Sequence, residues 1–186
     1  FGINSSKSES QFFKIENILK FSKVSEIKLK PLRKIEYDSN FSEFNKLIKN
    51  KKDSSDKYFF VTNNGRWTGF VDENILKTVS LKKWEQNFVG DFKKPIDSFE
   101  SVSYNDKLWR TIERLEETNE GFLLVLNAAN IPLGIIDRSK IGNFVLNKLG
   151  FNLPSEILNK LNFKNHYPLG IELPRIINSM KQKGDL

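Results

Sequence analysis

The spacing of apolar positions predicts short helices in the first part of the chain. Apolar side chains at near-helical spacing predict an amphipathic helix within 11–23, whereas the Ser-rich, polar stretch 1–10 is typical of a linker or a frayed end. Asp38 or Ser39 is the expected N-cap of a second helix. The apolar stripe of that helix consists of Phe41, Phe44, Leu47 and Ile48.

Two apolar runs have the length of buried strands, and each is followed by a turn. Residues 58–61 are Tyr-Phe-Phe-Val, and the Asn-Asn-Gly sequence at 63–65 is a strong signal for a tight turn between two strands. We therefore expect 67–71 to return as the second strand of a hairpin. The run 122–126 is followed by a polar turn, and 133–136 is its expected partner.

Further elements are expected on either side of these hairpins. Short extended segments are predicted within 27–35, where Pro31 interrupts, and within 99–103. Asn105 or Asp106 is the expected cap of a helix that precedes the second hairpin. The apolar positions of that helix are Leu108, Ile112 and Leu115.

The same order of elements occurs twice. Helices over 73–79 and 138–149 are expected to close the two copies. Short motifs also repeat at a spacing of 65 positions: Val24-Ser25-Glu26-Ile27 with Val89-Gly90-Asp91-Phe92, and Gly69-Phe70-Val71-Asp72 with Gly134-Ile135-Ile136-Asp137. A unit of this size buries too little surface to be stable alone, so two half-domains that share a core are expected.

The repeat sets the expected fold class and domain organisation. We predict a mixed α/β (α+β) fold with two β-α-β-β-α units, each a small sheet covered by helices. The expected divisions are an N-terminal linker or helix at 1–22, a first unit at 23–80, a second unit at 81–150 and a C-terminal helical extension at 151–186.

The extension carries two helix-start signals. Pro154 and Pro174 each fall where a first helical turn is expected, and proline is tolerated there because its missing N–H has no partner in a helix. The segment 167–170 is expected to be an ordered turn. We expect the extension to pack on the rest of the domain.

Composition restricts the class of protein. The chain has 186 residues, is 38% hydrophobic with 16 Phe, and therefore has enough apolar surface for a packed core. It has no cysteine, which excludes disulfides, thiol nucleophiles and cysteine-ligated zinc. The sequence contains no run of about 18 apolar residues, so no membrane span is predicted. The chain begins at Phe1 and has no signal-peptide pattern, so we expect either an excised fragment of a longer protein or a chain without its disordered start.

The net charge of +7 raises the question of anionic partners. Lysines are abundant toward both ends, which is compatible with nucleic acid or an anionic membrane surface. The basic residues are scattered rather than clustered, and this favours a solvated, lysine-rich surface.

No catalytic constellation is visible. His166 is the only histidine, and it has no acidic or cysteine neighbour, so we expect a structural role. Glu116 and Glu117 are expected on a solvated helix face. Neither a Gly-x-Ser-x-Gly turn nor a phosphate-binding glycine loop occurs. Of the tryptophans, Trp67 is expected in packing and Trp84 between the two units, while exposed Trp109 would mark a contact face.

The repeated motifs resemble those of CBS domains, and the resemblance covers roughly residues 23–150. Two CBS units form a pseudo-two-fold disc that often dimerises and commonly binds adenine nucleotides in the clefts between units. The family pattern is Gly, two hydrophobic residues, Thr or Ser near the phosphate, and Asp three residues after the Thr or Ser, on the ribose. The resemblance places candidate nucleotide-binding positions at Gly69, Asp72, Ile75, Gly134, Asp137 and Lys140.

Both copies depart from that pattern. Asp72 and Asp137 stand where the phosphate approaches and would repel it by about 1 kcal/mol or more. Ile75 cannot accept hydrogen bonds from a ribose, whereas Lys140 can pair with a phosphate. The second cleft is therefore the better candidate. The alternative is that both aspartates are helix N-caps.

The extension is similar to the end of cyanobacterial membrane zinc metalloproteases of the site-2 protease family. The similar stretches are 149–154, Leu-Gly-Phe-Asn-Leu-Pro, and 167–174, Tyr-Pro-Leu-Gly-Ile-Glu-Leu-Pro. In those proteins a CBS pair follows the membrane-embedded protease, whose zinc is bound through His-Glu-x-x-His. This chain has a single histidine and cannot supply that site, so zinc and proteolysis would belong to another part of the polypeptide.

These observations predict a non-catalytic regulatory CBS pair on the cytoplasmic face of a membrane. It would be attached to a membrane-embedded zinc metalloprotease, and it would sense an adenine nucleotide or mediate homodimerisation. The alternatives are a free-standing CBS metabolite sensor and a basic nucleic-acid-binding protein. Scattered charge disfavours nucleic acid as a partner.

Overall fold

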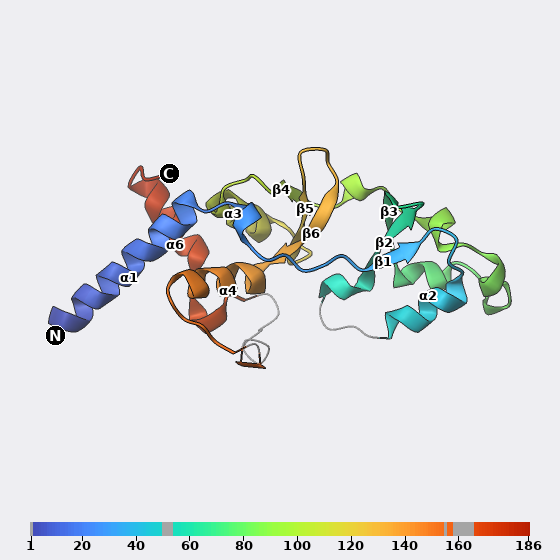
Figure 1. Cartoon of the computed structure of the whole chain (residues 1–186), viewed down its shortest axis with the longest axis horizontal. Helices are drawn as coiled ribbons and strands as arrows, with labels where there is room; N and C mark the ends of the chain where they lie inside the picture. Colours follow the sequence, from blue (N-terminus) through green and yellow to red (C-terminus); the bar gives the residue numbers. More distant parts are fainter. Residues whose placement is uncertain (1, 50–53, 155, 158–165) are drawn as a thin grey trace.

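The computed structural model describes residues 2–49, 54–154, 156–157 and 166–186. Two small sheets lie one after the other along an elongated molecule, and both chain termini lie at the same end (Figure 1). Within the described part of the chain, no helix is long and apolar enough to cross a membrane.

The first sheet contains β1 (Lys34–Glu36), β2 (Tyr58–Asn63) and β3 (Arg66–Asp72). β1 pairs with β2 in parallel, and β2 pairs with β3 antiparallel. The turn predicted at 63–65 is confirmed, because Asn64 and Gly65 both have a positive φ, 51° and 76°, as a tight hairpin turn requires.

The second sheet repeats this arrangement. It contains β4 (Ser101–Ser103), β5 (Phe122–Leu126) and β6 (Pro132–Asp137), again with one parallel and one antiparallel pair. Each hairpin has a register shift at the same place, after Val61 in the first sheet and after Val125 in the second. The predicted α+β fold class with two like units is thus confirmed.

The helices of the two units follow the predicted order. They are α2 (Phe41–Ile48), the 3₁₀ helix η3 (Glu73–Lys77), α3 (Leu108–Glu117) and α4 (Arg138–Lys148). The copies differ at their closing helix, which is a short 3₁₀ turn in the first unit and an 11-residue α-helix in the second.

Two predicted caps were wrong. Asn40, rather than Asp38 or Ser39, caps α2, because its side chain accepts from the Glu43 N–H while the Glu43 carboxylate accepts from the Asn40 N–H. These two bonds form a capping box. In the second unit, α3 begins after Lys107, which provides no side-chain cap. The Asp106 carboxylate instead accepts from the Ser103 N–H and closes the preceding turn.

Two predicted segment lengths also needed correction. The first helix, α1, spans Gly2–Phe21, so the Ser-rich stretch is helical rather than a linker. The segment 27–35 was expected to be extended, but it contributes to the first sheet only at its end, where β1 begins at Lys34. Lys30 in this segment instead pairs with Ile135 of the second sheet.

The opening motifs of the two units are exchanged. Val24 lies in the 3₁₀ turn η1 (Val24–Glu26) and is buried in the core around the second sheet. Val89 lies in the equivalent turn η5 (Val89–Phe92) and is buried in the core around the first sheet. Each sheet therefore has a core completed by a segment that precedes the other sheet in the sequence.

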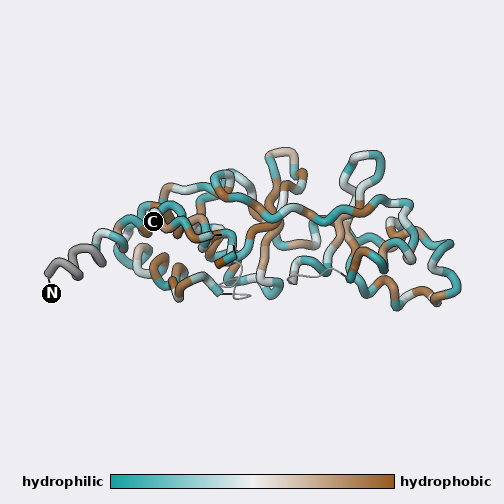
Figure 2. The backbone as a smooth tube through the Cα atoms, turned by 60° about the horizontal axis from the view of Figure 1, so that its bottom comes forward, coloured by the Kyte–Doolittle hydropathy of each residue, from teal (hydrophilic) through white to brown (hydrophobic). Residues whose placement is uncertain are grey.

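An aromatic cluster joins the two sheets. The ring centroid of Tyr58 in the first sheet lies 4.9 Å from that of Phe99 and 5.7 Å from that of Phe122 in the second sheet. Its buried members are Tyr58, Phe60, Phe70, Phe99, Phe122, Leu124 and Ile135. Figure 2 shows the apolar strands meeting along the middle of the molecule, with both hairpin tips projecting on one side.

Of the three tryptophans, only Trp67 lies where the sequence predicted. Trp67 packs against the aromatic cluster, as predicted. Trp84 is not a seal between the units, because it packs on the first core and donates to the Val79 carbonyl. Trp109 is half-buried against the second core, and Lys181 lies over its ring. Its ring is therefore covered by the C-terminal extension instead of marking an exposed contact face.

The C-terminal extension packs on the second unit as expected. Pro174 lies in the first turn of α6 (Leu173–Gln182), and this predicted helix start is confirmed. Buried residues of α6 join the second core beside α1 and α3. Pro168, in the turn η7 (Pro168–Gly170), sits where a Cβ on Gly142 of α4 would be 2.1 Å away. The helix start predicted at Pro154 falls mostly outside the described residues.

Candidate functional site

The two repeated motifs end at the closing helix of each unit. In the first unit, the Asp72 carboxylate accepts from the Asn74 N–H at 2.8 Å and caps η3. Lys94 places its ammonium 3.6 Å from the same carboxylate, whose side chain is only 12% exposed. Ile75 points into the first core and is 7% exposed. The first motif thus has a capped, ion-paired aspartate and a core residue at its two candidate polar positions.

The second motif is built differently. The Asp137 carboxylate accepts from the Lys140 N–H at 2.8 Å and caps the longer helix α4. Arg138 and Lys140 both lie in the first turn of α4, and both are half-buried. A full α-helix directs its N-terminal N–H groups and partial positive charge along its axis. Both candidate aspartates are therefore N-caps, and only the second is accompanied by basic side chains in the same turn.

The repeated glycines are explained by close backbone contact. A Cβ on Gly134 would lie 2.8 Å from the Lys30 carbonyl oxygen, and a Cβ on Gly69 would lie 2.4 Å from the Lys94 carbonyl oxygen. These distances are shorter than carbon and oxygen atoms tolerate. Glycine is needed at both positions because the segment around Lys30 crosses β6 and the segment around Lys94 crosses β3, each in direct contact with the strand.

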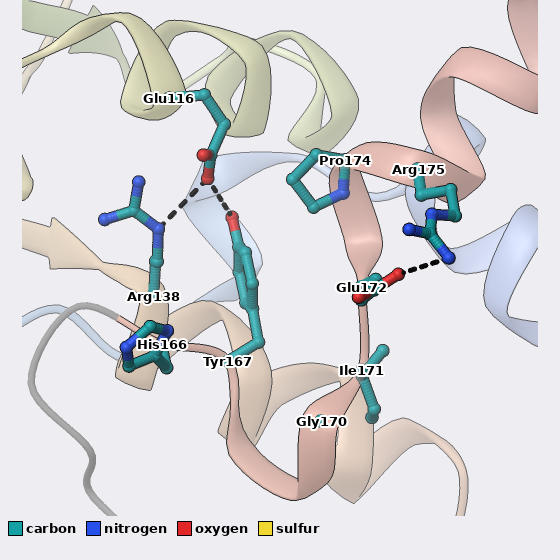
Figure 3. A pocket seen from close by; sticks show the side chains of 9 residues that line it. All are labelled: Glu116, Arg138, His166, Tyr167, Gly170, Ile171, Glu172, Pro174 and Arg175. Atoms are coloured by element: carbon teal, nitrogen blue, oxygen red, sulfur yellow. Dashed lines mark hydrogen bonds and ion pairs between the residues drawn. The ribbon is translucent and has the colours of Figure 1, made fainter.

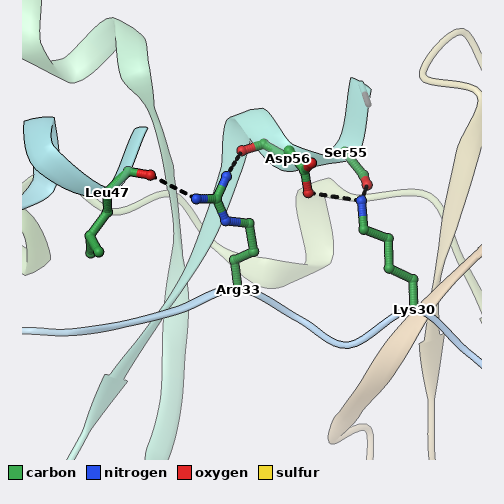
Figure 4. Close-up of polar contacts among 5 residues, drawn as sticks. All are labelled: Lys30, Arg33, Leu47, Ser55 and Asp56. Carbon is green, nitrogen blue, oxygen red and sulfur yellow. Dashed lines mark hydrogen bonds and ion pairs between the residues drawn. The ribbon is translucent and has the colours of Figure 1, made fainter. Parts of the chain in front are cut away.

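A partly buried ion pair ties the segment around Lys30, which crosses the second sheet, to the first unit (Figure 4). The Lys30 ammonium lies 2.8 Å from the Asp56 carboxylate and donates to the Ser55 hydroxyl. Arg33 donates to the Asp56 and Leu47 carbonyls, each at 2.7 Å, and covers the Phe59 ring. Sequence reasoning did not single out this cluster, because nothing in the local sequence shows that Lys30 and Asp56 meet.

A separate hollow of about 670 Å³ lies between the extension and the second unit (Figure 3). The Glu116 carboxylate accepts from Arg138 Nε at 3.0 Å and from the Tyr167 hydroxyl at 3.5 Å. Burial, followed by the negative charge of Glu116, raises the pKa of Tyr167 well above its ordinary value. His166 lies at the edge of this hollow and is exposed. Glu116 is exposed, as the sequence indicated, and it also accepts hydrogen bonds from Arg138 and Tyr167.

The hollow could be predicted only in part. The turn at 167–170 and the packing of the extension were expected, but the pairing of Arg138 with Glu116 depends on α3 and α4 lying side by side. Among the described residues, no group of three His, Asp or Glu side chains is arranged to hold a metal ion.

Comparison with known proteins relates this geometry to solved structures. The CBS domain of the bacterial CNNM/CorC family Mg²⁺ transporter superposes with a TM-score of 0.50 at 14% identity, covering 78% of this chain and 86% of that one. The same domain in complex with ATP gives 0.52 at 14% identity, over 75% and 97% of the two chains. The chain has the fold of a CBS domain pair.

A second solved structure agrees. A CBS domain-containing protein of unknown function from Bacillus anthracis str. Ames Ancestor gives a TM-score of 0.50 at 16% identity, covering 70% of this chain and 96% of that chain. No known protein-family model and no curated protein matches the sequence. At these identities the solved structures establish the fold of the CBS pair.

Proposed function

We propose that this CBS pair is a non-catalytic regulatory module that responds to an adenine nucleotide. The fold supports this proposal, and one of the similar solved structures is a complex with ATP. The observation that carries it is the difference between the two copies. The second motif is followed by a full helix with Arg138 and Lys140 in its first turn, whereas the first is followed by a 3₁₀ turn with buried Ile75.

The proposed site lies at the second motif, around Gly134, Asp137 and Lys140. A phosphate placed before α4 is attracted by the helix N-terminus and by the Lys140 ammonium. The Asp137 carboxylate opposes this attraction, but one of its oxygens already accepts from the Lys140 N–H. At the first motif the nearest basic group is Lys94, which pairs with the Asp72 carboxylate, and η3 itself carries no basic side chain before Lys77. We therefore assign the nucleotide to the second cleft.

The proposed response is conformational. The segment that crosses β6 is continuous with α1, and its backbone is bonded to Ile135 beside the second motif. A nucleotide that prefers one position of this segment would bias the orientation of α1 and of whatever domain is attached to it. The two sheets would transmit the change through their shared aromatic cluster.

We further propose the context of the module. The similarity of 149–154 and 167–174 to the site-2 protease family supports attachment to a membrane-embedded zinc metalloprotease, with the CBS pair on the cytoplasmic face. Its units would be 23–80 and 81–150, and the module would form homodimers. Zinc would belong to the protease. A gene encoding His-Glu-x-x-His and apolar helices before Phe1 would support this context, and a gene starting at the CBS pair would favour a free-standing sensor.

Thermal unfolding with AMP, ADP, ATP and S-adenosylmethionine at fixed salt tests the nucleotide proposal. A ligand at 100 times its dissociation constant stabilises the folded state by about 2.7 kcal/mol, which is a shift of about 5 °C or more for a chain of this size. The shift should be lost in Lys140→Ala and kept in Lys148→Ala, a control at the other end of the same helix. No shift with any of these compounds would refute nucleotide sensing.

A further inference from the structure

The hollow beside the extension has a fixed wall formed by residues from three elements. Glu116 comes from the end of α3, Arg138 from the start of α4, and Tyr167 from the segment before η7. The Arg138 side chain is 14% exposed, and Tyr167 is buried, so the contacts through Glu116 hold both groups in place. A wall of this kind is ordered before a ligand arrives, which lowers the entropy lost on binding.

The opposite wall is provided by the start of α6. Arg175 lies 2.9 Å from the Glu172 carboxylate, and both side chains are largely exposed. Ile171 and Pro174 add apolar surface between the two walls. Figure 3 shows Tyr167 standing between the side with Arg138 and His166 and the side with Glu172 and Arg175.

The charges lining the hollow balance. Two arginines face two glutamates, so the formal charge of the lining is zero with His166 neutral. Within the described residues, Arg138 uses only Nε and Arg175 only Nη1 for ion pairs, which leaves further donors on both guanidinium groups. Glu116 receives two donors, whereas Glu172 pairs with one arginine. Donors and acceptors of both signs are thus available in one hollow.

A neutral lining with separated charges favours a ligand that carries both charges. A simple anion would be repelled by the glutamates and a simple cation by the arginines, while a zwitterion can satisfy both. The volume of about 670 Å³ lies within the range of small-molecule sites and exceeds what a single amino acid fills.

We propose that this hollow binds a short zwitterionic peptide. The peptide carboxylate pairs with Arg138 beside His166, and the ammonium group pairs with Glu172. An apolar side chain of the peptide contacts Ile171 and Pro174, and its backbone passes over Tyr167. This site lies between the C-terminal extension and the second unit. It shares Arg138 with the first turn of α4 but does not use Asp137 or Lys140, and Glu172 belongs to the extension alone, so the variants Lys140→Ala and Glu172→Gln test the two proposals separately.

Isothermal titration of the whole chain with the dipeptide Ala-Phe, at millimolar concentration, tests this proposal. The matched probes are N-acetyl-Ala-Phe, which lacks the ammonium charge, and Ala-Phe amide, which lacks the carboxylate. Saturable binding of Ala-Phe is expected, with both blocked peptides about 10-fold weaker or worse. Equal binding of the three peptides, or none by Ala-Phe, would overturn the proposal.

Two variants assign the charges. Glu172→Gln should weaken Ala-Phe about 10-fold while leaving the binding of N-acetyl-Ala-Phe unchanged. Arg138→Gln should weaken Ala-Phe but not its amide. Glu100→Gln, which removes an exposed carboxylate paired with Arg114, is the control. If Arg138→Gln lowers the melting temperature, exposed Glu172 decides the outcome, and unchanged affinity in Glu172→Gln refutes the assignment.

Discussion

The backbone of Lys30 exchanges two hydrogen bonds with Ile135, each 2.9 Å long. The equivalent pair in the other copy is Lys94 with Phe70, joined by bonds of 2.8 and 3.0 Å. Each sheet is therefore extended by a segment that precedes the other sheet in the sequence. This reciprocal exchange ties the two units together, so that neither core is complete without the other unit.

The exchange predicts where two similar mutations will act. Val24 and Val89 are both fully buried, and either change to Ala should cost about 2 kcal/mol. Val24→Ala should reduce amide hydrogen-exchange protection most in β5, and Val89→Ala most in β2. Each variant is the control for the other. If Val24→Ala reduced protection most in the first sheet, or Val89→Ala most in the second, the exchange would be contradicted.

Gly134→Ala should destabilise the protein because the new methyl group meets the Lys30 carbonyl and Leu29. Overpacking of this kind costs about 2–3 kcal/mol. Gly184→Ala is the control, since Gly184 has a φ of 77° but nothing within 4 Å of its Cβ position, and backbone strain alone costs about 1 kcal/mol. Urea unfolding measures both. Equal losses in the free energy of unfolding of the two variants would show that the segment around Lys30 is not in close contact with β6.

Asp56→Asn should weaken the bond that holds the crossing segment to the first unit. The Asp56 and Lys30 side chains are only 7% and 20% exposed, so the loss of this charge should cost about 2 kcal/mol. Glu100→Gln breaks an ion pair with more than half of each side chain exposed and should cost less than about 1 kcal/mol. A comparable small loss in both variants, in chemical unfolding, would argue against the buried pair.

Stability should fall at high pH because the pKa of Tyr167 is raised by burial. Below pH 10 the hydroxyl is protonated in both the folded and unfolded states, and its stabilising contribution is complete. Above pH 10 the unfolded chain releases this proton while the folded chain retains it, so the unfolded state gains. At about pH 11 this effect is about 1 kcal/mol.

Urea unfolding of the wild type and of Tyr167→Phe, each at pH 8 and at pH 11, measures this effect. The variant lacks the hydroxyl and should lose about 1 kcal/mol less than the wild type between pH 8 and pH 11. Identical pH dependence in the two proteins would mean that Tyr167 is not buried in this way.

Much of the fold could be predicted from local patterns. The strands of both hairpins, the turn at Asn64-Gly65 and the order of elements follow from runs of apolar residues and from turn residues close in sequence. The α2 cap was missed by one residue because Asp38, Ser39 and Asn40 can all accept from a helix N–H. Only the position of Glu43 completes the capping box at Asn40.

The exchange of segments and the hollow beside the extension depend on contacts distant in sequence. Val24 and Val89 have the same pattern whichever core they enter, and Gly134 has the same sequence signature whether a ligand or a backbone carbonyl approaches it. Arg138 meets Glu116 only because α3 and α4, which are separated in sequence by β5 and β6, pack into the same core. The candidate residues at both motifs could be named from sequence, but the difference between a 3₁₀ turn and a full helix could not.

Chemical-shift mapping by NMR with ATP tests whether the nucleotide binds at the second motif. Saturable changes are expected to be centred on the backbone amides of 134–141, with smaller effects in the crossing segment around Lys30 and little change at 69–76. The changes should disappear in Lys140→Ala. Changes centred on 69–76, or none at saturating ATP, would contradict the assignment of a nucleotide to the second cleft.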